Sequence, residues 1–244
     1  MMKRIEIPSI PLLHLPAARE CRIVKRLNRF VVLVETEENT ARAHINNTGR
    51  LEELIIEGRT AYVLPTPHTA KTDFRLFAVA EGKEGALFDT RFQMISFEKA
   101  LAEHHIPWLK GCRFVRRDAR LGKSLIDYLI TCKEGPLYLE IKSAVLRQGE
   151  YASYPDCPTL RGQKHIRELT DHVRNEGSAA ICFMAALPDV DGFVPDDKAD
   201  PALADLLYRA EAAGVNIRAI SLHFSPEHST VFLDNPDLPV VLAG

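Results

Sequence analysis

Two acidic residues and a lysine are spaced so that they would meet on one face of a β-hairpin. Residues 125–131 and 136–142 have the apolar or alternating pattern of strands, and the polar residues and glycine between them predict a turn. Counting back from this turn places Asp127 opposite Glu140, with Cβ atoms about 4.5 to 5.5 Å apart. Since side chains alternate between the two faces of a strand, Lys142 is expected on the same face.

Two carboxylates this close repel each other, and a divalent cation between them would relieve the repulsion. Their oxygen atoms suit Mg²⁺ or Mn²⁺, which keep several waters and leave positions for a phosphate oxygen. Lys142 could orient or deprotonate an attacking water, or offset negative charge in the transition state. This chemistry is that of a metal-dependent nuclease. From these three residues alone, the alternative is a surface ion pair between Lys142 and one acid.

A longer motif follows these residues in the chain. Residues 139–146 read LEIKSAVL, and residues 151–169 read YASYPDCPTLRGQKHIREL. With LNRFV at 27–31, NTGRL at 47–51 and AAGV at 212–215, this pattern resembles the sugar fermentation stimulation protein A (SfsA) family along the whole chain. The resemblance implies an N-terminal OB-like β-barrel followed by a PD-(D/E)XK nuclease-like α/β domain with a mixed sheet. It also implies binding of DNA without sequence preference and a link to maltose metabolism, which is a phenotype and not a reaction.

Carried over to this chain, the resemblance makes Asp127 the second-motif acid, and Glu140 and Lys142 the E-x-K pair. It also makes Glu98, early in a helix expected over residues 97–105, the candidate for a further catalytic acid that would bind the metal. The alternative for Glu98 is an acid that stabilises a helix N-terminus.

The chain departs from the family pattern beside Asp127. The family usually has Ser-Arg-x-Asp-Phe, whereas this chain has Leu125 in place of the arginine and Tyr128 in place of the phenylalanine. An arginine that would point towards the acids is therefore absent, while the acids and the lysine are retained. We therefore expect this chain to retain metal binding rather than efficient catalytic turnover.

Two domains are expected, over residues 1–82 and 83–244. The first has a short helix at 49–56 and several short strands, as in OB-like barrels; the strands lie at 21–27, 30–35, 41–45, 61–65 and 74–80. The second alternates helices and strands, which predicts an α/β arrangement around a mixed sheet. Besides the two strands around the acids, it has helices at 97–105, 159–175 and 201–213 and strands at 179–187 and 216–224.

A local basic segment lies just ahead of Asp127, although the net charge of the chain is −2. Such a segment can bind phosphates even when the whole molecule is close to neutral. The alternative is a solvated surface without a partner. The candidate phosphate ligands in this segment are Arg116, Arg117, Arg120 and Lys123.

The helix expected at 159–175 has a polar side that could face the acids. There Arg161 and Lys164 would bind phosphates and Gln163 would steady a metal-bound water, unless these residues are simply solvated. His165 is expected to contact a phosphate or the loop at 154–158. Asp156 forms a literal Pro-Asp pair but follows Glu140 in the chain, so it is expected to cap or tether this loop. A zinc site is disfavoured because no fourth ligand is evident; it would use His165, Glu168 and His172.

The cysteines and the absence of targeting segments predict a cytoplasmic protein with no membrane partner. The five cysteines are odd in number and widely spaced and include no C-x-x-C, so reduced, mostly buried thiols are expected. The N-terminus has no basic-then-apolar signal, and no apolar run is long enough to cross a bilayer.

Three functions are compatible with these observations. The first is a Mg²⁺- or Mn²⁺-dependent nuclease acting on DNA or RNA, with the barrel holding the strand. The second is a non-catalytic regulator that binds DNA without sequence preference and is linked to sugar metabolism. The third is a metal-dependent hydrolase of small nucleotides, for which no base-reading pocket is evident. The sequence leaves open the strand preference and whether the chain forms a homodimer.

Overall fold

The N-terminal part of the chain folds into a small closed barrel. The structure is a computed structural model that describes residues 8–67 and 71–242. Five strands form the barrel: β2 (Arg19–Asn28), β3 (Val31–Glu35), β4 (Thr40–His44), β5 (Thr60–Pro65) and β6 (Phe74–Glu81). They pair in the order β4-β3-β2-β5-β6, and a parallel pairing between β4 and β6 closes the barrel. The expectation of an OB domain is confirmed.

A large mixed sheet continues from this barrel. Strand β6 forms a hairpin with β7 (Glu84–Leu87), which pairs with β15 (Asn216–Ser225). Beyond β15 the order is β13 (Ser178–Ala185), β10 (Gly135–Ala144), β9 (Ser124–Cys132) and β8 (Arg113–Leu121). Strands β10, β13 and β15 run parallel, and β8 and β9 pair antiparallel at the edge. The predicted mixed sheet is therefore confirmed.

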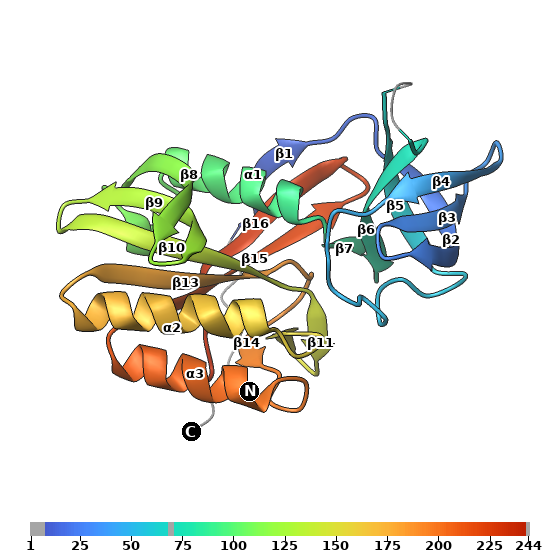
Figure 1. The fold of residues 1–244 in the computed structure, drawn as a ribbon. Coiled ribbons are helices and arrows are strands. Elements are labelled where there is room, and N and C mark those ends of the chain that lie inside the picture. Colours follow the sequence, from blue (N-terminus) through green and yellow to red (C-terminus); the bar gives the residue numbers. More distant parts are fainter. Residues whose placement is uncertain (1–7, 68–70, 243–244) are drawn as a thin grey trace.

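Helices cover both faces of this sheet. Helix α1 (Thr90–Ala102) lies on one face, and α2 (Leu160–Arg174) and α3 (Pro201–Ala212) lie on the other (Figure 1). Helix α2 begins at its N-cap Thr159, whose hydroxyl accepts the Gly162 N–H at 3.1 Å. Its apolar side packs on the sheet through Ile166 and Leu169, both of which are buried.

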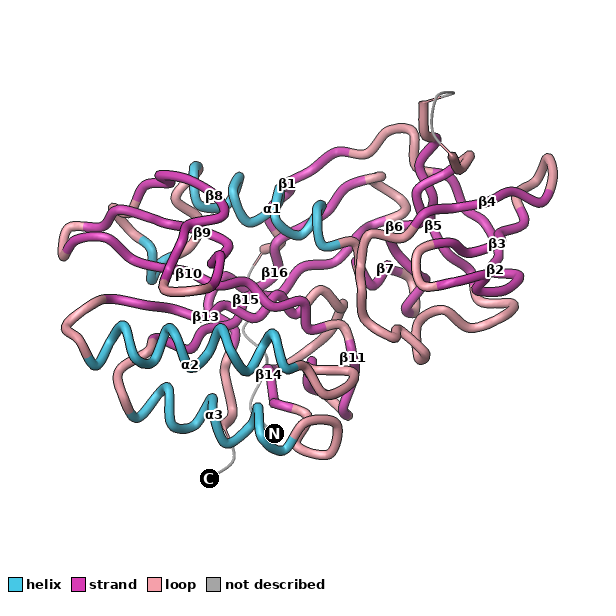
Figure 2. Tube along the Cα trace, viewed as in Figure 1, coloured by secondary structure: helices cyan, strands magenta, loops and turns pink. Residues whose placement is uncertain are grey.

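Short elements complete the fold and can be followed along the trace in Figure 2. Strand β1 (Ile10–His14) pairs with β16 (Thr230–Leu238), which returns along β15. A small second sheet contains β11 (Leu146–Gln148), β12 (Tyr151–Tyr154) and β14 (Gly192–Pro195). A single 3₁₀ turn at Pro107–Leu109 follows α1. Within the described residues, no helix is both long and apolar enough to span a membrane.

Two helix predictions need correction. Helix α1 starts at Thr90 rather than residue 97, because Asp89 caps it and is itself held by two hydrogen bonds from Arg75 at 2.6 and 2.7 Å. The helix expected at 49–56 is only a set of turns. There Leu51 has a positive φ of 53°, and its N–H donates to Asp156 at 3.0 Å, so a distant loop takes the place of a helical partner.

Edge strand β8 was not predicted as a strand. Seven of its nine side chains, those of residues 113–118 and Arg120, are exposed. An edge strand that faces solvent lacks the apolar alternation by which strands are recognised in a sequence. The basic segment ahead of Asp127 is therefore an edge strand of the sheet and not a loop.

The expectation of five reduced cysteines is wrong for two of them. Cys112 and Cys132 form a disulfide. Arg113 pairs with Thr131 across β8 and β9, so Cys112, which precedes β8, comes to lie opposite Cys132 at the end of β9. A separation of 20 residues in the sequence hides this cross-strand proximity. The remaining three cysteines are free thiols.

Candidate active site

Asp127 and Glu140 are in contact on adjacent strands, as the hairpin register predicted. Cys132 pairs with Gly135 and Tyr128 with Leu139, so Asp127 and Glu140 are the next pair. The Asp127 N–H donates to Glu140 Oε2 at 3.3 Å, and the Ile141 N–H donates to Asp127 Oδ2 at 2.8 Å. Each backbone therefore orients the carboxylate of the other strand.

Two cationic or proton-donating groups approach the same oxygen of Glu140. Lys142 Nζ lies 2.5 Å from Glu140 Oε1, and His165 Nδ1 lies 2.6 Å from it. His165 comes from α2, which covers this face of the sheet, and it is buried. The expectation that His165 contacts the 154–158 loop or a phosphate is corrected. Its place four residues before Leu169, on the apolar side of the helix, was the signal that it would be buried.

Burial and charge set the pKa values of this cluster. Burial and the charge of Glu140 raise the pKa of Asp127 to about 6. Burial alone would raise the pKa of Glu140, but Lys142 and His165 outweigh it and hold that pKa below its usual value. Burial alone would lower the pKa of Lys142, but Glu140 outweighs it, so the pKa is raised and the ammonium is kept. Asp127 is thus the carboxyl that lacks a cation.

Glu98 does not join this cluster. The Tyr128 hydroxyl donates to Glu98 Oε1 at 2.8 Å, and Tyr128 follows Asp127 in β9, so its side chain points to the other face of the sheet. Arg117 donates to both Glu98 oxygens at 2.6 and 2.7 Å. Within residues 8–67 and 71–242, no group of three or more His, Cys, Asp or Glu side chains is placed to hold a metal. Glu98 also lies in the middle of α1, so the helix N-terminus alternative is wrong too.

Most polar side chains of α2 do not face the acid pair. Gln163 is buried and donates to Asp200 at 3.0 and 3.1 Å, so it faces the start of α3 and not the acids. Lys164 donates to the carbonyl of Lys123 at 3.1 Å, which ties the helix to the turn before β9. Arg161 is exposed at the first turn of the helix. Of the four α2 residues predicted to lie at the site, His165 is therefore the one in contact with the acid pair.

The basic residues of β8 lie along the edge of the sheet. Arg116 and Arg120 are exposed, as is Lys123 in the following turn. Arg117 is also on the surface, but its guanidinium is paired with Glu98. Leu125, which stands where the family has arginine, is 46% exposed and shares the face of Asp127 by strand alternation. Among the described residues, Arg116, Arg120 and Lys123 have no ion-pair partner, and they lie on or next to the strand that pairs with the one carrying Asp127.

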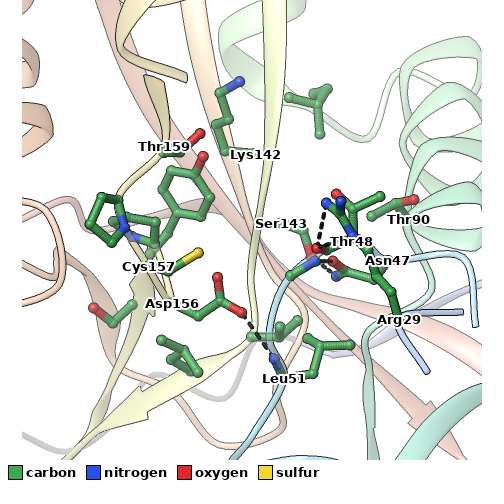
Figure 3. A pocket seen from close by; sticks show the side chains of 18 residues that line it. Arg29, Asn47, Thr48, Leu51, Thr90, Lys142, Ser143, Asp156, Cys157 and Thr159 are labelled. Atoms are coloured by element: carbon green, nitrogen blue, oxygen red, sulfur yellow. Dashed lines mark hydrogen bonds between the residues drawn. The ribbon is translucent and has the colours of Figure 1, made fainter. Parts of the chain in front are cut away.

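A pocket of about 320 Å³ opens between the barrel and the α/β domain. Figure 3 shows Lys142 at one end, with Cys157 and Asp156 on one side and Arg29, Asn47, Thr48 and Thr90 on the other. Asp156 joins the two sides, because its carboxylate accepts the Leu51 N–H at 3.0 Å. The prediction that Asp156 tethers its loop is confirmed by this bond. The residue that caps α2 is Thr159 and not Asp156. Sequence reasoning missed this pocket because its walls come from segments about a hundred residues apart.

Comparisons with known proteins cover the whole architecture. Residues 91–228 match the family described as the sugar fermentation stimulation protein RE domain, and residues 24–87 match the SfsA N-terminal OB domain. The chain belongs to the SfsA family. A sugar fermentation stimulation protein homolog of Pyrococcus furiosus is 47% identical over 203 residues, covering 83% of this chain and 88% of that protein. One from Archaeoglobus fulgidus is 45% identical over 231 residues, covering 95% and 99%.

A solved SfsA structure has the same fold as this chain. It is described as the structure of Pyrococcus furiosus SfsA in complex with Ca²⁺, and it matches with a TM-score of 0.91 and 43% identity. The match covers 95% of this chain and 99% of the solved one. The arrangement of the OB barrel and the α/β domain is therefore that of SfsA.

Proposed function

We propose that this SfsA protein is a nuclease that hydrolyses DNA or RNA phosphodiesters with Mg²⁺ or Mn²⁺. The observation that carries the proposal is the contact between Asp127 and Glu140, with Lys142 and His165 on the same carboxylate oxygen. Two acids and a lysine on neighbouring strands can hold a metal and supply the positive charge that metal-assisted phosphodiester hydrolysis uses. The match of residues 91–228 to the RE domain of the family supports the proposal.

The residues fit a divalent cation. Asp127 has a raised pKa because it is buried beside a second carboxylate, and a cation would remove this penalty. Lys142 and His165 occupy Glu140 Oε1, and the Ile141 N–H occupies Asp127 Oδ2. Asp127 Oδ1 and the weakly bonded Glu140 Oε2 are thus the oxygens left to hold the ion. Two carboxylates with waters and a substrate phosphate suffice for Mg²⁺. The related Pyrococcus structure with Ca²⁺ is consistent with a divalent ion.

The bound metal would polarise the scissile phosphate and lower the pKa of an attacking water. Lys142 keeps its proton beside Glu140, so we assign it to offsetting negative charge on the phosphate rather than to accepting a proton. His165 is a positioning residue, because it contacts Glu140 Oε1 from α2 and so fixes the orientation of that carboxylate. Leu125 supplies no charge where the family arginine would, so turnover is expected to rely on Lys142.

The exposed basic residues of β8 would hold the nucleic acid. Arg116, Arg120 and Lys123 line the sheet edge next to the acids and are free to bind phosphates. Contacts of this kind recognise the backbone and not the bases, in keeping with binding that has no sequence preference. Their contribution would fall as salt rises.

The test is cleavage of labelled single- and double-stranded DNA and RNA in Mg²⁺, Mn²⁺ and EDTA. Glu140→Gln removes the charge that Lys142 and His165 share, and Glu134→Gln in the exposed β9–β10 turn is the matched control. Metal-dependent cleavage that is lost only in Glu140→Gln supports the proposal. Absence of cleavage, with binding that persists in EDTA and weakens with salt, would instead support the non-catalytic DNA-binding regulator.

A further inference from the structure

The pocket between the barrel and the α/β domain is lined by charged and polar groups that belong neither to the acid pair nor to the basic strand β8. It is built from two loops of the barrel, residues 29 and 47–51, and from the end of β10 and the β12–α2 loop. Lys142 belongs both to this pocket and to the acid cluster, through its hydrogen bond to Glu140. The pocket therefore opens directly beside the residues proposed to hold the metal.

The walls of the pocket are fixed before any ligand arrives. Asp156 on one side accepts the Leu51 N–H from the other at 3.0 Å. The Asn47 side chain donates to the Phe88 carbonyl at 3.0 Å and accepts the Gly49 N–H at 2.9 Å. Arg29 donates to the Thr48 carbonyl at 3.0 and 3.2 Å. The bonds of Leu51 to Asp156 and of Asn47 to Phe88 hold the barrel loop against the α/β domain, and the other bonds fix the shape of the barrel loops, so the pocket is preformed.

The two ends of the pocket differ in charge. Lys142 provides an ammonium at one end, and the carboxylate of Asp156 lies at the other (Figure 3). Between them, the lining alternates apolar groups such as Leu51 with the hydroxyls of Thr48 and Thr90. An ammonium suits a phosphate, and a carboxylate suits hydrogen-bond donors such as a base amino group. The volume of about 320 Å³ is at the small end of ligand sites and cannot admit a duplex.

An exposed aromatic ring lies beside Arg29, which lines the pocket. Phe30, in the turn between β2 and β3, is 45% exposed, and the Arg29 guanidinium lies 5.6 Å from its ring centre. Tyr62 and Phe77 of the barrel are, by contrast, buried in the core. An exposed aromatic ring beside an arginine is a common platform for an unpaired base.

We infer that the interdomain pocket binds one unpaired nucleotide of the substrate, with its phosphate at Lys142 and an amino-bearing base edge at Asp156. The next base would stack on Phe30. This inference rests on the proposed function and narrows it, because the preferred substrate is then a single strand or a frayed end and not a continuous duplex. Asp156 lies outside the acid cluster, and in this inference its carboxylate accepts a hydrogen bond from the amino group of the base.

Cys157 allows a direct measurement of pocket occupancy. Its thiol lines the pocket, whereas the free thiols of Cys21 and Cys182 are buried. The rate of alkylation of Cys157 by a maleimide would be followed by mass spectrometry in EDTA, where no cleavage occurs. The probes are a short oligodeoxycytidine and a blunt two-strand G·C duplex of the same length, and Cys157→Ser identifies the signal.

The expected result is protection by the single strand. At an oligodeoxycytidine concentration about tenfold above its Kd, alkylation should slow about tenfold, and the blunt duplex should leave the rate unchanged. Thr48→Trp, which fills the pocket from an exposed position, should weaken single-strand binding about tenfold, while Thr40→Trp on the far side of the barrel should not.

Other outcomes separate the two proposals. If anisotropy shows that oligodeoxycytidine binds but Cys157 is not protected, or if the duplex protects equally well, the pocket inference is overturned and the nuclease proposal stands. If Thr48→Trp binds the single strand as the native protein does, the inference is likewise overturned. If neither probe binds at any salt concentration, the proposed function fails and the inference fails with it.

Discussion

Glu98 and Asp127 lie on opposite faces of the same sheet. Glu98 accepts the hydroxyl of Tyr128, the residue that follows Asp127, so the strand itself separates the two carboxylates. A helical acid was expected to complete the metal site, and the structure instead uses Glu98 to anchor α1 to β8 and β9 through Arg117 and Tyr128. The candidate site is therefore a two-acid site, and this has a direct consequence for mutants.

Replacing Glu98 should affect stability and spare cleavage. Glu98→Gln would weaken the bidentate pair with Arg117, which is partly exposed, so a loss of about 1 kcal/mol in the free energy of unfolding is expected. Metal-dependent cleavage should stay within about threefold of the native rate, against a loss of at least about a hundredfold for Glu140→Gln. Denaturant unfolding and single-turnover cleavage measure the two effects. Abolished cleavage in a folded Glu98→Gln protein would return this residue to the catalytic set.

Removing the charge of Asp127 should stabilise the metal-free protein. The pKa of Asp127 is about 6 in the folded state and about 3.9 in an unfolded chain. Since the folded pKa is the higher one, the favourable contribution of this carboxyl is complete below pH 4 and is lost as the pH rises to 6. In EDTA at pH 7 to 8, Asp127→Asn should therefore be more stable than the native protein by about 1 to 3 kcal/mol.

Metal should reverse this order. Mn²⁺ should raise the unfolding temperature of the native protein and have little effect on Asp127→Asn, because the variant has lost a ligand charge. Thermal unfolding at pH 4, 6 and 8, with and without Mn²⁺, measures both effects. Equal stability of the two proteins in EDTA across this range would show that Asp127 titrates normally and that the acid pair is not strained.

His165 should act through Glu140. His165→Leu keeps an apolar contact but removes the group 2.6 Å from Glu140 Oε1, so metal affinity and cleavage should fall about 10- to 100-fold. His165→Gln retains a donor and should recover part of the loss. Mn²⁺ affinity measured by calorimetry distinguishes positioning from a simple packing defect, because a packing defect would lower the unfolding temperature and leave the affinity unchanged.

The Cys112–Cys132 disulfide should stabilise the edge of the sheet. A crosslink that closes a loop of this length contributes about 3 kcal/mol in the chain-entropy description. Reductant should thus lower the unfolding temperature of the native protein and leave the double variant Cys112→Ser, Cys132→Ser unchanged. Alkylation under denaturing conditions, before and after reduction, counts the thiols. Five reactive thiols before reduction would contradict the disulfide.

The free arginines of β8 should set the salt dependence of binding. Arg116→Ala with Arg120→Ala should reduce the slope of log Kd against log salt by about 2, since each phosphate contact contributes about 0.9. Arg117→Ala should change the slope less, because that guanidinium is already paired with Glu98. Anisotropy titrations from low to moderate salt provide the slopes. Equal slopes in the native protein and the double variant would place the nucleic acid elsewhere on the surface.

Local pattern was enough to predict the core of the site. The alternation of residues 125–131 and 136–142 and a four-residue turn determined the register, and register alone brings Asp127, Glu140 and Lys142 together. The amphipathic α2, the strands β13 and β15 and the strands of the barrel were also predictable, because each buries one face or a continuous apolar run.

Other features depended on contacts between segments that are distant in the chain. The cap of α1 relies on Arg75 holding Asp89, the turn at Leu51 relies on Asp156, and the pocket joins two domains. Strand β8 is held by pairing with β9 and not by burial, so its sequence lacks the usual alternation. The sequence by itself therefore indicated the family through its motifs, and it determined the strand register and the acid pair, which follow from periodicity within short segments. Only the tertiary structure decided which face Glu98 occupies, that His165 supports Glu140 and that Cys112 meets Cys132, because these depend on how separate elements pack.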